Sequence, residues 1–124
     1  MSFASILKSI VDECGGGLGA ALMGNDGIPI DQVMASAPIA GPLGDDVGAA
    51  GVEFGRILDE IRKASDALGG GTLAETVVSL ARFTLVLRHV DDDTFLVLAL
   101  APDGNLGKAR YLIRRHLIAL RDEL

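Results

Sequence analysis

The chain has 124 residues, the length of one domain, and 49% of them are apolar, which is enough to fill a packed core. Its net charge of −6 argues against a domain whose whole surface binds nucleic acid. The charge is uneven: residues 1–104 hold six basic and fifteen acidic residues (−9), whereas residues 105–124 hold five basic and two acidic residues (+3).

The single cysteine, Cys14, excludes an internal disulfide and fits a reducing compartment. The first residues, MSFASILKSIVDE, have no basic segment before their apolar positions and end in two acids, so no signal peptide is expected. No apolar run approaches the length of about 18 residues that a membrane span needs. These features predict a cytoplasmic protein.

The first expected element is a helix that Ser2 caps and that the glycines at 15–17 end, because apolar residues repeat between them at helical spacing. A short strand follows from Leu18 to Met23. The sequence Gly-Asn-Asp-Gly at 24–27 predicts a hairpin turn, since these residues accept positive φ. The second strand covers about 28–34, where Pro29 indicates an edge strand or a strand start.

A loop is expected at 35–44, because it contains two prolines and two glycines. A long helix, capped by Asp45 or Asp46, then continues to about Leu68, and the glycines at 69–71 end it. Three strands follow at about 73–80, 83–90 and 94–101. Asn105 or Asp103 caps a last helix that runs to about residue 123.

The resulting order, α-β-β-α-β-β-β-α, predicts one domain over residues 1–124, of the α/β (α+β) class with a five-stranded antiparallel sheet. The strand at 94–101 is apolar almost throughout, so we expect it at the centre of the sheet with both faces covered. The first and last helices can cover one face. The second helix covers the other face or part of it.

The second helix carries a heptad-like seam with alternating spacings of four and three residues. Its members are Val47, Gly51, Phe54, Leu58, Ile61, Ser65 and Leu68, and Ala50, Ile57 and Ala64 widen it. Glycines at 48, 51 and 55 each cost about 1 kcal/mol of helix propensity relative to alanine, so close approach of another backbone must explain them. Either the chain's own sheet approaches, or the same helix of a second copy does.

One helix over a five-stranded sheet leaves apolar surface exposed, and large exposed apolar patches mark interfaces. We therefore predict a homodimer in which part of the seam meets its symmetry mate. Sedimentation of the chain as a monomer would contradict this prediction.

The glycine-rich stretch ECGGGLGAALMGNDGIPID at 13–31 does not indicate a nucleotide site. A dinucleotide fingerprint needs a strand before its glycines and a helix after them, which is the reverse of the order here, and no Gly-Lys-Ser/Thr follows. Read as an EF-hand loop, the stretch places Leu22 and Gly24 at ligand positions, which excludes calcium. No cofactor is expected.

No catalytic or metal site is expected either. His89 and His116 have no cysteine or carboxylate partners at metal-ligand spacing, and no Ser-His-Asp set can be assembled. Cys14 lies in the apolar phase of the first helix and is expected to be a buried, inert thiol. The three aspartates at 91–93 are interpreted as a solvated hairpin loop. The chain is therefore not expected to be an enzyme.

The last helix is basic beside an apolar stripe, with Arg110, Arg114 and Arg121 near one another on a helical wheel. These arginines either form a solvated rim or meet an acidic partner or a membrane surface. As candidate partner-surface residues we name Arg56 and Arg62 on the second helix, and Arg110 and Arg114 on the last.

The order of elements, the hairpin GLGAALMGNDGIPI, the block LVLRHVDDDTFLVLALAPDGNLG and the helix start NLGKARYLIRR resemble the Roadblock family. That family includes dynein light chains and bacterial MglB-like regulators of Ras-like GTPases, and the resemblance covers nearly the whole chain. It implies a profilin-like sandwich. It also implies a dimer whose third strands pair edge to edge into one ten-stranded sheet, with the two second helices side by side.

By this resemblance the dimer contacts would include Phe54, Leu58, Ile61, Thr76 and Val78, and the seam of the second helix adds Val47 and Gly51. The implied function is that of a homodimeric, non-catalytic activating protein or co-activator of a small Ras-like GTPase, bound two to one on the face of the second helix. The concentration of basic charge on the last helix and the glycines of the second depart from the expected GTPase-binding surface. A structural adaptor with no effect on GTP hydrolysis is the alternative.

A small-molecule sensor or enzyme is a third alternative, because profilin-like sheets can hold ligands. It requires a pocket with converging polar groups, and the sequence offers none that can be named.

Overall fold

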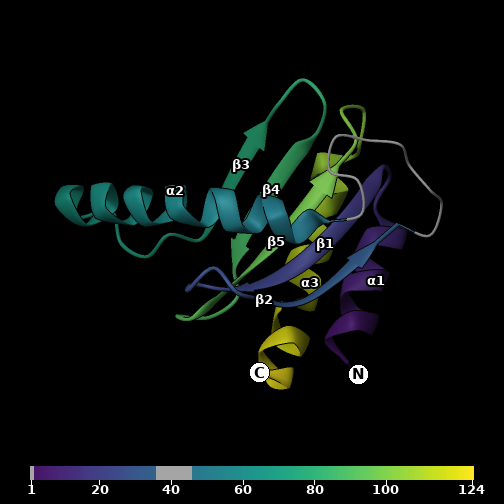
Figure 1. The fold of residues 1–124 in the computed structure, drawn as a ribbon, viewed down its shortest axis with the longest axis horizontal. Helices are drawn as coiled ribbons and strands as arrows, with labels where there is room; N and C mark the ends of the chain where they lie inside the picture. Colours follow the sequence, from purple (N-terminus) through teal and green to yellow (C-terminus); the bar gives the residue numbers. More distant parts are fainter. Residues whose placement is uncertain (1, 36–45) are drawn as a thin grey trace.

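A computed structural model of the chain describes residues 2–35 and 46–124, and in these residues three helices surround one five-stranded antiparallel sheet (Figure 1). The elements in chain order are α1 (Phe3–Glu13), β1 (Gly17–Gly24), β2 (Pro29–Met34), α2 (Val47–Leu68), β3 (Glu75–Ser79), β4 (Thr84–His89), β5 (Thr94–Leu100) and α3 (Leu106–Glu123). This order confirms the prediction. The expected loop at 35–44, apart from Ala35, and the alternative cap Asp45 lie outside the described residues.

Side-chain caps start all three of these helices. The hydroxyl of Ser2 accepts from the backbone N–H of Ser5, the carboxylate of Asp46 from that of Ala49, and the amide oxygen of Asn105 from that of Lys108. Each bond satisfies an N–H that the first turn of a helix leaves without a partner. At the other end of α2, Gly69 adopts the left-handed conformation with φ of 67°, as a C-terminal glycine is expected to do.

The strand order is β2-β1-β5-β4-β3, so β5 is the central strand, as predicted from its apolar sequence. Every residue of β5 from Thr94 to Leu100 is buried. The strand that contains Pro29 lies at one edge, again as predicted, and β3 forms the other edge.

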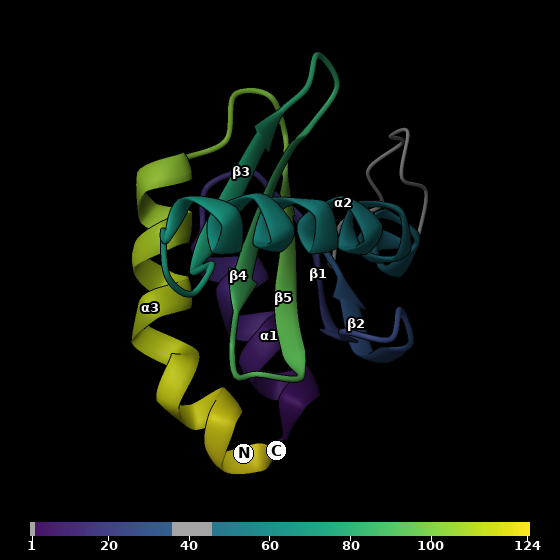
Figure 2. The same cartoon turned by 90° about the vertical axis from the view of Figure 1, so that its left-hand side faces the viewer.

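Two apolar cores lie on the two faces of the sheet. In Figure 2, α2 crosses in front of the strands and α1 lies behind them. The core behind the sheet joins α1 and α3 through residues that include Ile6, Ile10, Leu98, Leu112 and Ile113. The core in front joins α2 to the other face of the sheet, and its members include Met23, Val47, Leu58, Phe95 and Val97.

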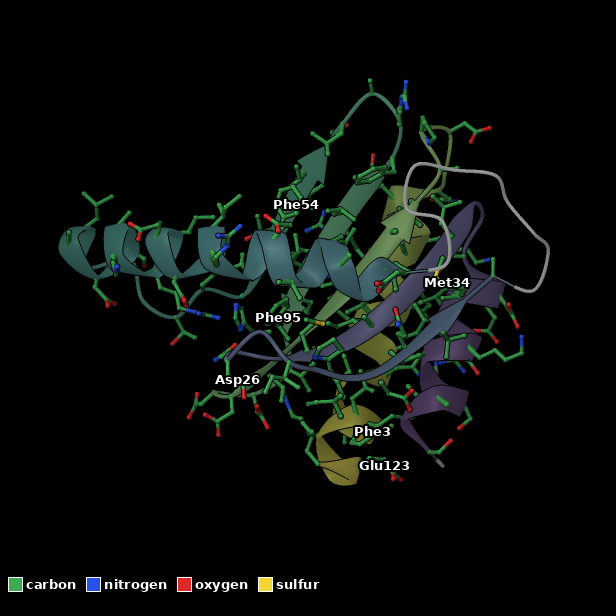
Figure 3. The ribbon with its side chains drawn as sticks, in the orientation of Figure 1. Phe3, Asp26, Met34, Phe54, Phe95 and Glu123 are labelled. Atoms are coloured by element: carbon green, nitrogen blue, oxygen red, sulfur yellow. The ribbon has the colours of Figure 1, made fainter. Side chains whose placement is uncertain are left out.

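The sheet explains the three glycines of α2. A Cβ at Gly51 would lie 2.7 Å from Cγ and from Sδ of Met23, which is fully buried. A Cβ at Gly55 would lie 3.3 Å from Cζ of Phe95, a β5 residue in the same core (Figure 3). At Gly48 it would lie 3.3 Å from Oε1 of Gln32. Of the two explanations for the small residues, the structure therefore supports close approach by the chain's own sheet.

The two halves of α2 differ in what they cover. The helix packs chiefly over β1, β2 and β5. After Leu58, none of the residues up to Leu68 is buried. Figure 1 shows this second half projecting past the edge strand β3. Residues 59–68 therefore form an overhang with no buried residue, attached to the sheet near its start by Ile61, which packs against the front core, and by Arg62, which contacts His89.

The packing at Gly51 predicts a specific cost for one added methyl group. We expect Gly51→Ala to be less stable than Gly107→Ala by about 1–3 kcal/mol, because the new methyl displaces Met23 in a filled core. The gain in helix propensity partly cancels between the two variants, since both glycines are helical. At Gly107 the nearest atom to a new Cβ is Oδ1 of Asn105, at 3.7 Å.

Urea unfolding of both variants and of the wild type measures the difference. Equal free energies of unfolding for the two variants would contradict the packing argument.

Candidate functional site

An apolar flank runs along α2 beside the line of residues that faces the sheet. Phe54, Ile57, Ile61 and Leu68 follow one another at spacings of three, four and seven residues, which places them on one side of the helix. Ile57 is 50% exposed and Leu68 is 85% exposed, whereas Phe54 and Ile61 are half-buried. This flank is too apolar to be an ordinary solvated helix face.

The edge strand β3 presents a second set of side chains toward the same side of the sheet. Thr76 lies opposite Leu87 and Val78 opposite Leu85, and these leucines belong to the core beneath α2. Both β3 side chains are only half-buried. Within the described residues β3 pairs with β4 alone, so its outer edge carries backbone groups that no strand satisfies.

The flank and the strand together form one surface, which we call the α2–β3 surface. It consists of Phe54, Ile57, Ile61, Leu68, Thr76 and Val78. It combines exposed aliphatic side chains with an open strand edge, and both features favour contact with another polypeptide.

The seven predicted dimer contacts separate into two groups. Phe54, Ile61, Thr76 and Val78 lie on the α2–β3 surface. Three others, Val47, Gly51 and Leu58, are instead buried between α2 and the sheet, with Leu58 only 2% exposed. The protomer's own sheet covers these three, so they have no surface left for a second copy.

The four predicted partner-surface arginines do not form one surface. Arg56 and Arg62 lie on α2, whereas Arg110 and Arg114 lie on α3, which packs on the other face of the sheet. Arg56 is exposed and pairs with Glu53 on its own helix. Arg114 is exposed on α3. The remaining two arginines make contacts within the chain that connect distant elements.

Arg110 connects α3 to the edge strand β3. Its Nε donates to Oε1 of Glu75 at 2.9 Å and its Nη2 donates to Oε2 at 2.8 Å, a bidentate pair. Arg110 holds the pKa of the Glu75 carboxyl below its usual range, chiefly through these hydrogen bonds. The pair fixes the start of β3 from the side opposite the α2–β3 surface.

Arg62 connects the overhang of α2 to two other elements. It pairs with Asp59 on its own helix, and its Nη2 donates to Oδ1 of Asn25 in the β1–β2 turn at 3.3 Å. The same nitrogen lies 3.0 Å from Nε2 of His89 at the end of β4. Asn25 in turn donates through Nδ2 to the backbone oxygen of Asp92 in the β4–β5 turn, at 2.6 Å. The predicted surface role of Arg62 is therefore accompanied by a structural one.

His89 is half-buried beside this junction. Burial lowers the pKa of its imidazole below the ordinary value of 6.5, and the nearby Arg62 and Arg88 lower it further, against a smaller opposing effect of Asp59. The neutral ring can accept the hydrogen bond that the Arg62 guanidinium offers. No sequence pattern indicates this contact, because the two residues are 27 positions apart.

In the described part of the chain, no group of three or more His, Cys, Asp or Glu side chains could hold a metal ion. Cys14 is buried, as expected, and burial raises the pKa of its thiol above the ordinary value. No helix in residues 2–35 and 46–124 is both long and apolar enough to cross a membrane.

The fold that carries this surface is shared with Roadblock/LC7 domains. One from Streptomyces avermitilis is similar with a TM-score of 0.82 at 16% identity, over 98% of this chain and 97% of that chain. The gliding protein MglB from Thermus thermophilus gives a TM-score of 0.81 at 22% identity, over 96% of this chain and 85% of that chain. At these identities the likeness concerns the fold.

A nearer relative establishes the family. MglC from Myxococcus xanthus has 38% sequence identity to this chain over 100% of both chains, with a TM-score of 0.71. This chain belongs to the same family as MglC, the Roadblock family. No family model matches the chain, and a comparison with curated proteins gives no match.

The lowered pKa of His89 predicts a pH dependence of stability. The unfolded chain binds a proton at His89 near pH 6.5, whereas the folded chain binds this proton only at a lower pH. The contribution of His89 to the free energy of unfolding should therefore be constant at pH values above the ordinary histidine pKa. It should fall as the pH decreases below that pKa, since the unfolded state then binds more protons than the folded state. Urea unfolding between about pH 7.5 and about pH 6, where carboxylates stay ionised, measures this decrease.

The variant His89→Gln removes the titrating group and should flatten this part of the profile. An unchanged slope in the variant would show that another group is responsible.

Proposed function

We propose that this protein is a homodimeric, non-catalytic regulator of a small Ras-like GTPase, acting as its activating protein or co-activator. The observation that carries the proposal is the α2–β3 surface, where an apolar helix flank continues into an open strand edge. The single cysteine supports a reducing compartment, such as the cytoplasm.

The dimer would form about a two-fold axis beside β3. Pairing of the two β3 edges would satisfy their free backbone groups and extend the sheet to ten strands. The α2 flanks would then lie side by side, and each overhang would gain the support that its own sheet does not give. The α2 overhang has the length and the apolar side chains for this contact. Self-association is supported by a protein of the same fold, since a solved structure of MglB has a tetrameric arrangement.

Regulation would follow from binding alone. A protein that binds one switch state of a GTPase better than the other shifts the population toward that state without donating a catalytic group. The gliding proteins among the structural neighbours support a role of this class. The outward side of α2, with Arg56 and the exposed Val52, remains open in the proposed dimer and is where we place the GTPase.

The dimer is tested by a matched pair of substitutions. Ile57→Glu places a charge on the α2–β3 surface, whereas Ile118→Glu does so at an isoleucine of α3 that is 70% exposed. In a two-fold interface each substitution acts twice, and loss of about 1.5 kcal/mol per buried isoleucine weakens the dimer roughly a hundredfold or more. Sedimentation equilibrium should show monomers for I57E and dimers for I118E. Dimers of equal affinity in both variants would exclude this surface as the dimer interface.

The regulatory role is tested with a Ras-like GTPase from the same organism, loaded with GTP or GDP. We expect preferential recovery of one loaded form in a pull-down and a faster GTP hydrolysis when the protein is added. I118E should retain both effects and I57E should lose them. Equal recovery of the two forms with unchanged hydrolysis would favour the structural adaptor instead.

A further inference from the structure

A cleft of about 400 Å³ lies at the end of the sheet where α2, β4 and α3 come together. Arg62 of α2, Arg88 and His89 of β4, and Arg121 of α3 line it, and the loop after α2 closes one side with Gly71 and Thr72. We call it the arginine cleft. None of the residues that line it belongs to the α2–β3 surface, although both sites include residues of the α2 overhang.

Three guanidinium groups from three elements are an unusual concentration in a chain with a net charge of −6. Arg62 is paired with Asp59, whereas Arg88 and Arg121 have no ion pair within the described residues, so these two are the groups in the cleft that can bind negative charge. Burial, and after it the charges of Arg62 and Arg88, lower the pKa of the neighbouring His89 imidazole, against a smaller opposing effect of Asp59.

The cleft also holds hydrogen-bond donors that no protein group uses. Within the described residues the side chain of Arg88 makes no hydrogen bond, and its Nε is buried without a partner. Arg121 donates from Nε to the backbone oxygen of Val90, and its two outer nitrogens make no other hydrogen bond in this part of the chain. Unused guanidinium donors are the groups that bind an oxyanion in bidentate fashion.

The loop after α2 adds backbone donors in a fixed position. The hydroxyl of Ser65 donates to the backbone oxygen of Gly71 at 2.8 Å, which ties the loop back to the helix. Gly71 has φ of +83°, a conformation that favours glycine. The N–H groups of Gly71 and Thr72 make no hydrogen bond to the described residues.

Three carboxylates at the rim limit the charge that the cleft can accept. Asp66, Asp91 and Asp92 also line it. Asp91 is already engaged, since one carboxylate oxygen accepts from the Thr94 hydroxyl at 2.7 Å and from the backbone N–H of Asp93 at 2.9 Å. Asp66 and Asp92 disfavour an extended polyanion by charge repulsion. A single compact oxyanion can lie among the guanidinium groups without contacting these two carboxylates.

We propose that the arginine cleft binds a compact tetrahedral oxyanion, either free phosphate or the phosphate of a small phosphate ester, through Arg88, Arg121 and the loop at 71–72. Arg62 contributes positive charge at the α2 side while it remains bonded to Asn25 and Asp59. This site supplies the converging polar groups that a ligand-binding sheet protein needs.

The test is a titration of the full-length chain, in the oligomeric state that it adopts in solution, followed by ¹H–¹⁵N NMR. Inorganic phosphate should shift the amide signals of Gly71 and Thr72 and the Nε signals of Arg88 and Arg121, in a saturable manner. Sodium chloride at equal ionic strength should not do so. A second titration with O-phosphoserine distinguishes a phosphate ester from free phosphate by whichever binds more tightly. Shifts that chloride reproduces, or no shifts with either phosphate compound, would overturn the proposal.

Variants at the cleft are compared with a matched arginine outside it. Arg121→Gln should weaken phosphate binding at least about tenfold, the loss expected for one charge-assisted contact. Arg115→Gln removes the same charge from an exposed position on α3 and should leave the affinity unchanged. Arg88→Gln should also weaken phosphate binding. Because Arg88 is half-buried, the thermal unfolding of this variant is measured as well, to check that it folds. Equal weakening in R115Q and R121Q would mean that net charge, not the cleft, is responsible.

Discussion

The rest of the structure depends on the burial of the central strand β5 on both faces. A strand whose side chains from Thr94 to Leu100 are all buried needs a layer of cover on each side of the sheet. Two helices, α1 and α3, supply one layer. The other layer is the single helix α2, which packs over β1, β2 and β5 and leaves β3 with half-buried side chains. The exposed α2–β3 surface is thus a consequence of covering five strands with one helix.

Much of this arrangement could be predicted from the sequence, because its signals are local. Ser2 and Asn105 cap the helices that their positions predict, and Pro29 lies in an edge strand where its missing N–H costs nothing. The candidate interface was predicted less well. A spacing of three and four residues identifies one side of a helix, but it does not say whether a sheet or a second helix lies against that side. Val47, Gly51 and Leu58 therefore appeared as partner contacts although the chain's own sheet covers them.

The arginine cleft could not be predicted for a different reason. Its cations come from positions 62, 88 and 121, and neither their spacing nor their neighbours in the sequence indicates a shared site. Only the sheet order places the end of β4 between α2 and α3. The α2 flank at Ile57 and Leu68 was more accessible to prediction, since its residues belong to one helix and repeat at helical spacing. Sites formed by charged residues that lie far apart in the sequence are therefore the hardest part of a fold to predict from sequence patterns.

The two proposed sites share one physical element, the overhang of α2. No residue after Leu58 in this helix is buried, so the second half has less packing against the protomer than the first half. Ile61 attaches it to the core beneath α2, and Arg62 attaches it to Asn25 and His89. A second copy that packs on the flank and an oxyanion that binds beside Arg62 would each contact the same half-helix. Linkage then requires that whatever factor the bound oxyanion applies to the dimerisation constant, dimer formation applies to oxyanion affinity.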